Sequence, residues 1–175
     1  MKSKKAIPPR WVEAHTRVRW SECDLQGHAY YGSFVPWCDL GRETLGLALS
    51  IPYTRYQLLT TSFSIKYHQP ANYLDELLIR CWATTPTARL DVNYQIFRVP
   101  GNTLLADATS QHALVDATGL KMVAPPEFHL RFDAFLRGED PSQVRIPEPA
   151  TNGEPSEAVP VEVGADASST ADGVS

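Results

Sequence analysis

The stretch Trp20-Ser21-Glu22-Cys23-Asp24-Leu25-Gln26-Gly27-His28-Ala29-Tyr30-Tyr31-Gly32-Ser33-Phe34 leads an acidic residue through a glycine-bearing loop into the start of an amphipathic helix. Before it, residues 16–20 alternate polar and apolar side chains, as a half-buried strand does. After it, apolar or small residues recur on one helical face: Phe34, Trp37, Cys38, Gly41, Leu45 and Ala48. The sequence therefore predicts a strand, a loop and a long helix in this order.

Two residues indicate where the helix begins. Pro36 has no N–H and would break a helix interior, but it is tolerated in the first turn. The helix should therefore start at about Gly32 or Ser33, with Ser33 as its N-cap. This start leaves the Tyr31 and Gly32 amides at the mouth of the helix, where Gly32 lets a ligand approach the backbone closely.

A carboxylate facing a helix start has a definite chemical use. The first amides of a helix lack internal partners and carry partial positive charge, so they can hold an oxygen that becomes negative. An ionised Asp24 nearby can attack a carbonyl carbon or activate water. The pairing suits acyl transfer, with Asp24 as the reacting acid.

Composition divides the chain into unequal parts. It has 175 residues, 43% of them hydrophobic, which is enough for one substantial core. The whole chain has a formal net charge of −4. From residue 138 onward there are eight acids and one base, a net charge of −7, so the residues before 138 have a net charge of +3. We expect an N-terminal extension over 1–13, one domain over 14–137 and an acidic disordered tail over 138–175. The weak basic balance does not indicate nucleic acid, but it is compatible with a small phosphate-bearing ligand.

The sequence also carries predictions about compartment and cofactors. It shows neither a signal-peptide core nor an apolar run of 18 residues, so we expect a cytoplasmic protein without membrane contact. Three cysteines, Cys23, Cys38 and Cys81, cannot all pair, which favours reduced thiols. The five histidines show no ligand spacing and no phosphate-binding glycine loop occurs, so neither a metal nor another cofactor is expected.

Strands dominate the chain after the helix. They are predicted over residues 62–68, 76–85, 89–98 and 104–115, joined by short turns that include one at 116–119. One helix followed by such strands predicts an α+β fold, in which an antiparallel sheet wraps around a central helix. The 76–85 strand is apolar on both faces. Because one helix covers only one face of the sheet, we expect the other face to pack on a second subunit.

Three blocks of sequence together resemble a known family. They are residues 23–31, residues 67–71, and residues 114–119 with 125–128. They look like the hotdog-fold acyl-CoA thioesterases of the 4-hydroxybenzoyl-CoA thioesterase type, over roughly residues 14 to 135. The resemblance implies that Asp24 acts as nucleophile or as base toward water, and that the backbone amide of Tyr31 polarises the thioester carbonyl. It also implies an acyl-CoA substrate and a homodimer or homotetramer with sites at subunit interfaces.

Other residues of the loop are candidates for substrate binding. Gly27 is expected to shape the loop, His28 to act as a general acid or to donate to the thioester, and Gly32 to admit the ligand. Tyr30 and Tyr31 would line an aryl or medium-size acyl pocket, and we expect one of the two rings to pack in the core. Many relatives have an Asn-Tyr pair at residues 33–34, where this chain has Ser-Phe, and an apolar residue or Asn at His28. These departures concern substrate choice.

Several alternatives stay open. Cys23 is a second candidate nucleophile, although the neighbouring carboxylate would raise the pKa of its thiol. Glu43 lies on the helix, where another hotdog subfamily uses a glutamate, but Asp39 and Arg42 beside it favour a solvated charged face. In a second hypothesis, the enzyme hydrolyses thioesters in which an acyl carrier protein, instead of CoA, carries the acyl group. In a third, the protein binds acyl thioesters without catalysis. A hotdog dehydratase fits the loop less well.

Overall fold

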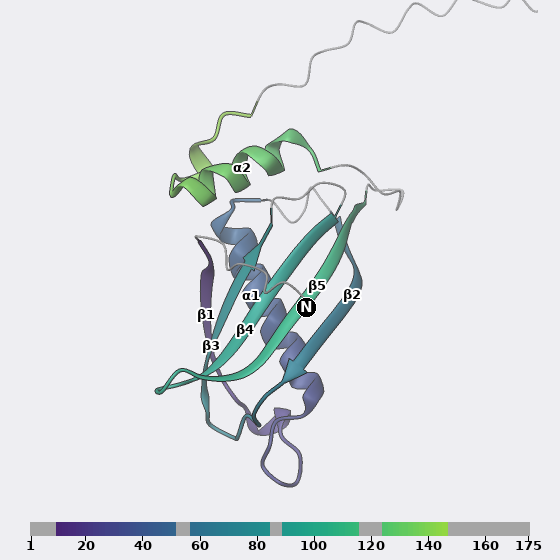
Figure 1. Ribbon diagram of the computed structural model, residues 1–175, viewed down its shortest axis with the longest axis vertical. Coiled ribbons are helices and arrows are strands. Elements are labelled where there is room, and N and C mark those ends of the chain that lie inside the picture. Colours follow the sequence, from purple (N-terminus) through teal and green to yellow (C-terminus); the bar gives the residue numbers. More distant parts are fainter. Residues whose placement is uncertain (1–9, 52–56, 85–88, 116–123, 147–175) are drawn as a thin grey trace, which may run out of the picture.

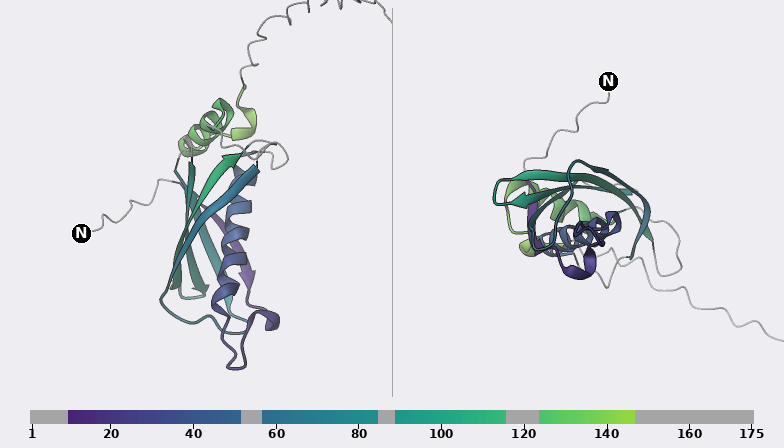
Figure 2. Two further views of the ribbon diagram at one scale, coloured as in Figure 1. Left: turned by 90° about the vertical axis from the view of Figure 1, so that its right-hand side faces the viewer. Right: turned by 90° about the horizontal axis from the view of Figure 1, so that it is seen from below.

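Five antiparallel strands form one curved sheet, and helix α1 (Phe34–Ala48) lies along one of its faces (Figures 1 and 2). The computed structural model describes residues 10–51, 57–84, 89–115 and 124–146. The strands are β1 (Val12–Arg17), β2 (Gln57–Tyr67), β3 (Glu76–Ala83), β4 (Arg89–Val99) and β5 (Thr103–Val115), in the spatial order β1-β3-β4-β5-β2. The predicted antiparallel sheet around a central helix is confirmed.

The predicted apolar face of α1 is the face that packs on the sheet. Phe34, Trp37, Cys38, Gly41 and Leu45 are all buried. At Gly41 the helix approaches the sheet so closely that an added Cβ would lie 2.9 Å from Ile79 Cγ2 and 3.1 Å from Cys81 Cβ. Glycine therefore sets the spacing between α1 and β3, and this spacing keeps the helix start at a fixed distance from the strands around it.

Strand β3 is buried on both faces, as its sequence predicts. Ile79 and Cys81 point toward α1, so alternation along the strand directs Leu78 and Trp82 to the opposite face. Both of these outward side chains are buried within a single chain. At these two positions burial does not need a second subunit, and the expectation that the opposite face of the sheet packs on one stays a prediction.

The core contains a chain of hydrogen-bonded polar groups between the sheet strands. Tyr94 Oη lies 2.9 Å from Ser110 Oγ, and Ser110 Oγ lies 2.7 Å from His112 Nε2. His112 Nδ1 lies 3.2 Å from Thr60 Oγ1 on β2. Burial, aided by the charge of Arg42, lowers the pKa of His112 to about 4. His112 is therefore neutral at neutral pH, and its hydrogen bonds link β2, β4 and β5.

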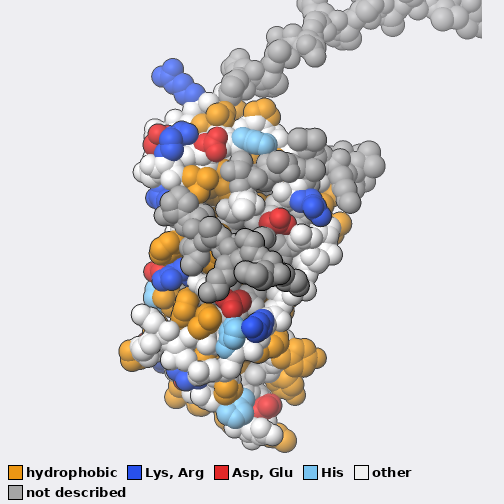
Figure 3. Space-filling view, viewed as in Figure 1, with side chains coloured by type: hydrophobic (Ala, Val, Ile, Leu, Met, Phe, Trp, Pro, Cys, Tyr) orange, Lys and Arg blue, Asp and Glu red, His pale blue; other side chains and the backbone are white. Residues whose placement is uncertain are grey.

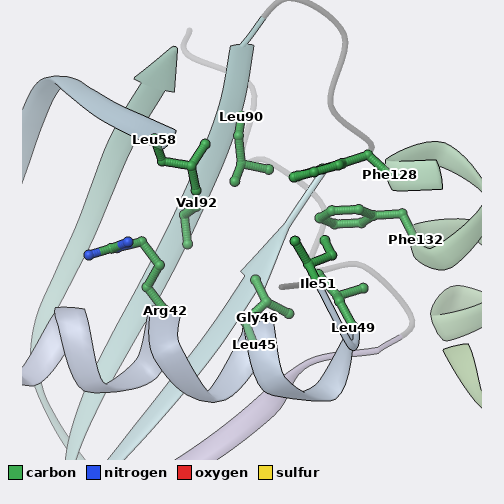
Figure 4. Close-up of a pocket in the computed structure, with 10 residues that line it drawn as sticks. All are labelled: Arg42, Leu45, Gly46, Leu49, Ile51, Leu58, Leu90, Val92, Phe128 and Phe132. Carbon is green, nitrogen blue, oxygen red and sulfur yellow. The ribbon is translucent and has the colours of Figure 1, made fainter. Parts of the chain in front are cut away.

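A second helix, α2 (Pro126–Arg137), crosses one end of the sheet and is absent from the sequence-based expectation (Figure 1). Its Phe128 and Phe132 point toward the C-terminal end of α1 and Leu90 (Figure 4). The apolar cavity between them has a volume of about 30 Å³, which is small beside ligand pockets of about 300–1,000 Å³. This cavity is a small packing gap at the end of the molecule opposite the loop.

The chain beyond α2 still packs against the domain. Arg131 Nη1 donates to the carbonyl of buried Pro141, and the short 3-10 turn η3 (Pro141–Gln143) follows. The expected boundary between domain and tail, after residue 137, falls within this packed segment. The predicted turn at 116–119, residues 1–9 of the predicted extension, and residues 147–175 of the predicted tail lie outside the described residues.

Candidate active site

The quoted loop folds as a small hairpin at the end of the molecule away from α2 (Figure 1). Tyr30 N donates to Glu22 O and Asp24 N donates to His28 O, each at 2.8 Å. Three residues close the hairpin, and Gly27 takes the left-handed conformation at φ +78°, which glycine adopts without steric cost. Gly27 shapes the loop as expected, and its part in substrate binding stays a prediction. The expected strand over 16–20 instead ends at Arg17, and Trp20–Glu22 forms a 3-10 turn (η1).

Asp24 lies where the hairpin turns. Its Oδ1 accepts the Gln26 N–H at 2.8 Å and the His28 N–H at 3.2 Å. Its Oδ2 has no hydrogen-bond partner among the described side chains and backbone groups. One carboxylate oxygen thus holds the turn, as aspartate commonly does. The other oxygen is available to a reacting group.

Glu22 connects the hairpin to the helix, and sequence reasoning missed this role. Its Oε1 accepts from Trp37 Nε1 at 3.1 Å and its Oε2 accepts from Arg19 N at 2.7 Å. Its backbone carbonyl accepts from Tyr30 N at 2.8 Å and from Ser33 Oγ at 3.0 Å. Glu22 therefore fixes the Asp24 hairpin relative to the first turns of α1. The three-residue spacing between Arg19 and Glu22, typical of a glutamate that returns to an N-cap amide, was the available signal.

The helix starts through a 3-10 turn, η2 (Tyr31–Ser33), which leads directly into α1. Ser33 occupies the N-cap position as predicted, but its backbone is already helical and its hydroxyl donates to Glu22 O instead of capping. The expected side-chain cap was therefore wrong. The Tyr31 and Gly32 amides find no acceptor among the described residues, and a Cβ at Gly32 would meet only open space. Two unpaired N–H groups thus lie at the exposed start of the helix.

His28 is held by a side chain from the next segment of the chain. Its Nδ1 donates to Asn72 Oδ1 at 2.8 Å, and the hairpin pairs with residues 71–73 through Ala29 N to Ala71 O at 2.8 Å. With Nδ1 as the donor, Nε2 of neutral His28 is an acceptor. In this tautomer Nε2 of His28 does not donate to a thioester.

A groove of about 330 Å³ opens beside the helix start. It is lined by Ala29, Tyr31, Phe34, Tyr67, His68, Gln69 and Pro70. Tyr67 closes one side, because its ring meets Phe34 edge-on at 5.1 Å and its hydroxyl donates to Tyr31 O at 2.9 Å. Burial raises the pKa of Tyr67, so its phenol keeps the proton that it donates. Asp24 is not among the residues that line this groove.

Both tyrosine rings of the motif face solvent. Tyr30 is 57% exposed and Tyr31 is 75% exposed. The expectation that one of them packs in the core was wrong. The reason is η2, because a 3-10 turn advances three residues per turn and delays the buried face of the helix to Phe34.

The alternative nucleophiles have less favourable surroundings. Burial first, and then the charges of Asp24 and Glu22, raise the pKa of Cys23, so its thiol stays protonated at neutral pH. Burial raises the pKa of Cys38 to about 12, and it raises that of Cys81 further. Glu43 is exposed on α1, one turn from the Asp39–Arg42 ion pair at 2.9 Å.

A search for metal-ligand geometry finds no group of three His, Cys, Asp or Glu side chains within the four described ranges. In the same ranges, neither the length nor the hydrophobicity of any helix reaches that of a membrane span.

Solved structures of similar shape identify the fold. Slr0204, a 1,4-dihydroxy-2-naphthoyl-CoA thioesterase from Synechocystis, superposes with a TM-score of 0.64 at 20% identity, covering 73% of this chain and 96% of its own. The DHNA-CoA thioesterase of Staphylococcus aureus gives a TM-score of 0.66 at 15% identity, covering 77% of this chain and 97% of its own. The fold is the hotdog fold that the sequence resemblance implies.

Sequence comparison then defines the family. Residues 18–134 match the thioesterase-like superfamily, so the chain belongs to this superfamily and is a thioester hydrolase. A relative from Bacillus subtilis (strain 168), named "Putative acyl-CoA thioesterase YneP", is 25% identical over 126 residues, which are 66% of this chain and 91% of YneP. The family match over residues 18–134 includes the whole hairpin and helix start described above.

Proposed function

We propose that this protein hydrolyses acyl-CoA thioesters to the free acid and CoA. One observation carries the proposal: a single hairpin joins a carboxylate with a free oxygen, at Asp24, to a helix start with two unpaired amides, at Tyr31 and Gly32. The thioester oxygen would accept from the Tyr31 amide, where charge develops during attack. Relatives named as acyl-CoA thioesterases support CoA as the carrier.

Asp24 would act in one of two ways. As a nucleophile, its oxygen attacks the carbonyl carbon, the C–S bond breaks, and CoA leaves as a thiolate that takes a proton from solvent; water then hydrolyses the acyl-aspartyl anhydride. As a general base, it removes a proton from water while the water oxygen attacks the same carbon; the C–S bond then breaks, and the CoA thiolate takes up a proton from Asp24 or solvent. Gly27 would keep the hairpin turned, and His28 and Gly32 would border the bound thioester.

An aryl or medium-size acyl group fits the rings at the helix start. Tyr31, Phe34 and Tyr67 line the groove beside the Tyr31 amide, and exposed Tyr30 precedes them. Aromatic faces bury planar acyl groups well and offer apolar surface to alkyl chains. The three free cysteines are consistent with a reducing compartment, so the proposal includes the cytoplasm.

Thiol release tests the proposed activity. Wild-type protein should release CoA from at least one of benzoyl-CoA, phenylacetyl-CoA and hexanoyl-CoA, measured with Ellman reagent. Because the chain has its own three cysteines, only thiol beyond three equivalents per chain counts as turnover. If the protein hydrolyses an acyl carrier protein thioester but none of the acyl-CoA thioesters, the carrier in the substrate is the acyl carrier protein and not CoA. Binding of acyl-CoA without any release would make the chain a non-catalytic acyl-thioester binder.

We also propose a homodimer or homotetramer, on the basis of strand β2. It has 11 residues and ends the strand order β1-β3-β4-β5-β2, so one long side of its backbone has no strand beside it within the described sheet. Exposed edges of this length are normally paired or covered. A second copy paired there would extend the sheet and bring a partner surface toward the groove at the helix start.

Light scattering during size-exclusion chromatography should therefore give at least twice the 19.4 kDa mass of one chain. Leu59→Lys on exposed β2 should reduce this mass, because a charge at a paired edge opposes association. Leu130→Lys on the exposed side of α2 is the matched control and should leave the mass unchanged. A monomeric wild type would contradict the proposal.

A further inference from the structure

Glu22 lies between the two halves of the proposed site, the Asp24 hairpin and the start of α1. Within the described part of the chain, the hydrogen bonds that join residues 19–29 to Ser33 and α1 both end on Glu22. Trp37 Nε1 donates to Glu22 Oε1 at 3.1 Å, and Ser33 Oγ donates to the Glu22 carbonyl at 3.0 Å. Glu22 and Trp37 are 15 residues apart in sequence, so the bond between them closes the segment that contains the hairpin and the helix start.

One end of this link is built into the core. Trp37 is only 3% exposed, and a buried indole N–H needs an acceptor. The Glu22 carboxylate supplies it. The Trp37 and Phe34 rings have centroids 4.8 Å apart, and Phe34 lines the groove at the helix start. The link therefore reaches from the hairpin to a wall of the groove.

The other end of the link holds the hairpin through its main chain. Glu22 Oε2 accepts from Arg19 N at 2.7 Å, and the Glu22 carbonyl accepts from Tyr30 N at 2.8 Å. These bonds attach Glu22 to the chain on both sides of the turn at Asp24. Glu22 thus connects the carboxylate of Asp24 to the amides at the helix start.

Burial contributes little to holding the tip of the hairpin. Leu25, next to Asp24, is fully exposed, and hydrophobic side chains reach the surface at this end of the molecule in Figure 3. Segments with few buried contacts open locally at a low cost in free energy. The hydrogen bonds from the hairpin to residues 71–73 attach it to that segment and not to α1. The position of the hairpin relative to α1 therefore depends on Glu22.

We infer that Glu22 is a positioning residue of the proposed acyl-CoA hydrolysis. Its carboxylate holds the hairpin on α1, so that the free oxygen of Asp24 and the Tyr31 amide meet the same thioester carbonyl. Both carboxylate oxygens of Glu22 already accept hydrogen bonds, so Glu22 acts through the hairpin and not on the substrate. The inference rests on the proposed function. Because a misplacement of about 1 Å can cost about 10²-fold in rate, loss of the link should lower kcat.

Steady-state thiol release by variants of the full chain tests the inference, with whichever of benzoyl-CoA, phenylacetyl-CoA and hexanoyl-CoA the wild type hydrolyses fastest. Glu22→Ala removes both acceptors and should lower kcat per folded molecule about 10- to 100-fold, while KM stays within about twofold. Glu22→Gln keeps an oxygen for Trp37 but places an NH₂ group against the Arg19 N–H, so its loss should be smaller. Trp37→Phe keeps a ring in the core without the indole N–H and should lower kcat about tenfold.

Two further measurements separate positioning from general destabilisation. If Glu22→Ala and Trp37→Phe remove the same link, the double variant should have the kcat of Glu22→Ala, whereas independent losses would multiply. Hydrogen exchange followed by mass spectrometry should be faster over residues 22–30 of Glu22→Ala and unchanged over β4. Circular dichroism gives the folded fraction of each variant.

The chain offers a matched control pair. Trp11 Nε1 donates to Glu13 Oε1 at 3.1 Å, the same distance as between Trp37 and Glu22, but Glu13 lies on β1. Glu13→Ala and Trp11→Phe remove this other tryptophan–glutamate bond. Both variants should keep the kcat and KM of the wild type.

Wild-type kcat in folded Glu22→Ala and Glu22→Gln would overturn the inference and leave the proposed hydrolysis standing, as would multiplied losses in the double variant. A raised KM with unchanged kcat would also overturn it, because Glu22 would then act on substrate binding. If Glu22→Ala does not fold, Glu22→Gln and Trp37→Phe decide by the same criteria. If the wild type hydrolyses no thioester, the proposed function itself is wrong and the inference falls with it.

Discussion

Asp24→Asn should leave the protein folded and lower kcat for thioester hydrolysis by about 10²–10⁴-fold, the usual contribution of a positioned acid or base. Asparagine keeps a carbonyl oxygen where Asp24 Oδ1 accepts from the Gln26 and His28 amides, so the hairpin turn should persist. What the substitution removes is the negative charge needed for attack or proton removal. Steady-state thiol release and circular dichroism together measure the two effects.

The comparison with Asp24→Ala sharpens this prediction. Alanine removes both the charge and the turn-forming oxygen, so it should lose activity to a similar extent and also destabilise the hairpin. If Asp24 served only to form the turn, Asp24→Asn would hydrolyse thioesters like wild type and only Asp24→Ala would be impaired. That pattern would rule out Asp24 as the reacting acid.

Phe132→Ala should lower the free energy of unfolding by about 3–5 kcal/mol, the cost of deleting a buried phenylalanine ring. The Phe132 side chain of α2 is buried against the C-terminal end of α1. It lines an existing cavity of about 30 Å³, which the substitution would enlarge (Figure 4). The corresponding fall in Tm is about 10 °C. Urea unfolding followed by tryptophan fluorescence measures the change.

Leu130→Ala on the exposed side of α2 is the control and should cost no more than about 0.5 kcal/mol. Because α2 and the Asp24 hairpin lie at opposite ends of the molecule, Phe132→Ala should leave kcat per folded molecule unchanged. Equal stability of the two variants would mean that α2 unfolds independently of the sheet.

Periodicity predicted the fold well where the pattern was local. The apolar spacing from Phe34 to Leu45 identified the buried face of α1. An apolar run predicted β3, alternation predicted β4 and the turn before it predicted β5, each to within a few residues. Helix α2 was not predicted. Phe128, Phe132 and Phe135 recur at helical spacing, but the preceding Pro125–Pro126 pair is typical of a turn. Proline is nevertheless tolerated as the first residue of a helix, and α2 begins at Pro126.

The site was predictable only in part, since several of its contacts join residues distant in sequence. Asp24 and the Tyr31 amide follow from a loop before a helix. The bond from Trp37 to Glu22 and the pairing of His28 with Asn72 depend on how the hairpin folds back onto other segments. No local pattern encodes these contacts. Similarly, the sequence pattern suggested that one of the two tyrosine rings is buried, but with η2 at the helix start both rings lie at the surface.

The amide at Tyr31 belongs to the main chain, and this has an evolutionary consequence. Backbone hydrogen bonds and Glu22 hold the hairpin and the helix start, whereas the rings of Tyr30 and Tyr31 project into solvent. Substitutions at residues 30 and 31 can therefore reshape the proposed entrance for the acyl group without removing the N–H that we propose polarises the carbonyl. Descendants of such a scaffold can diversify their substrates while inheriting the reacting geometry intact.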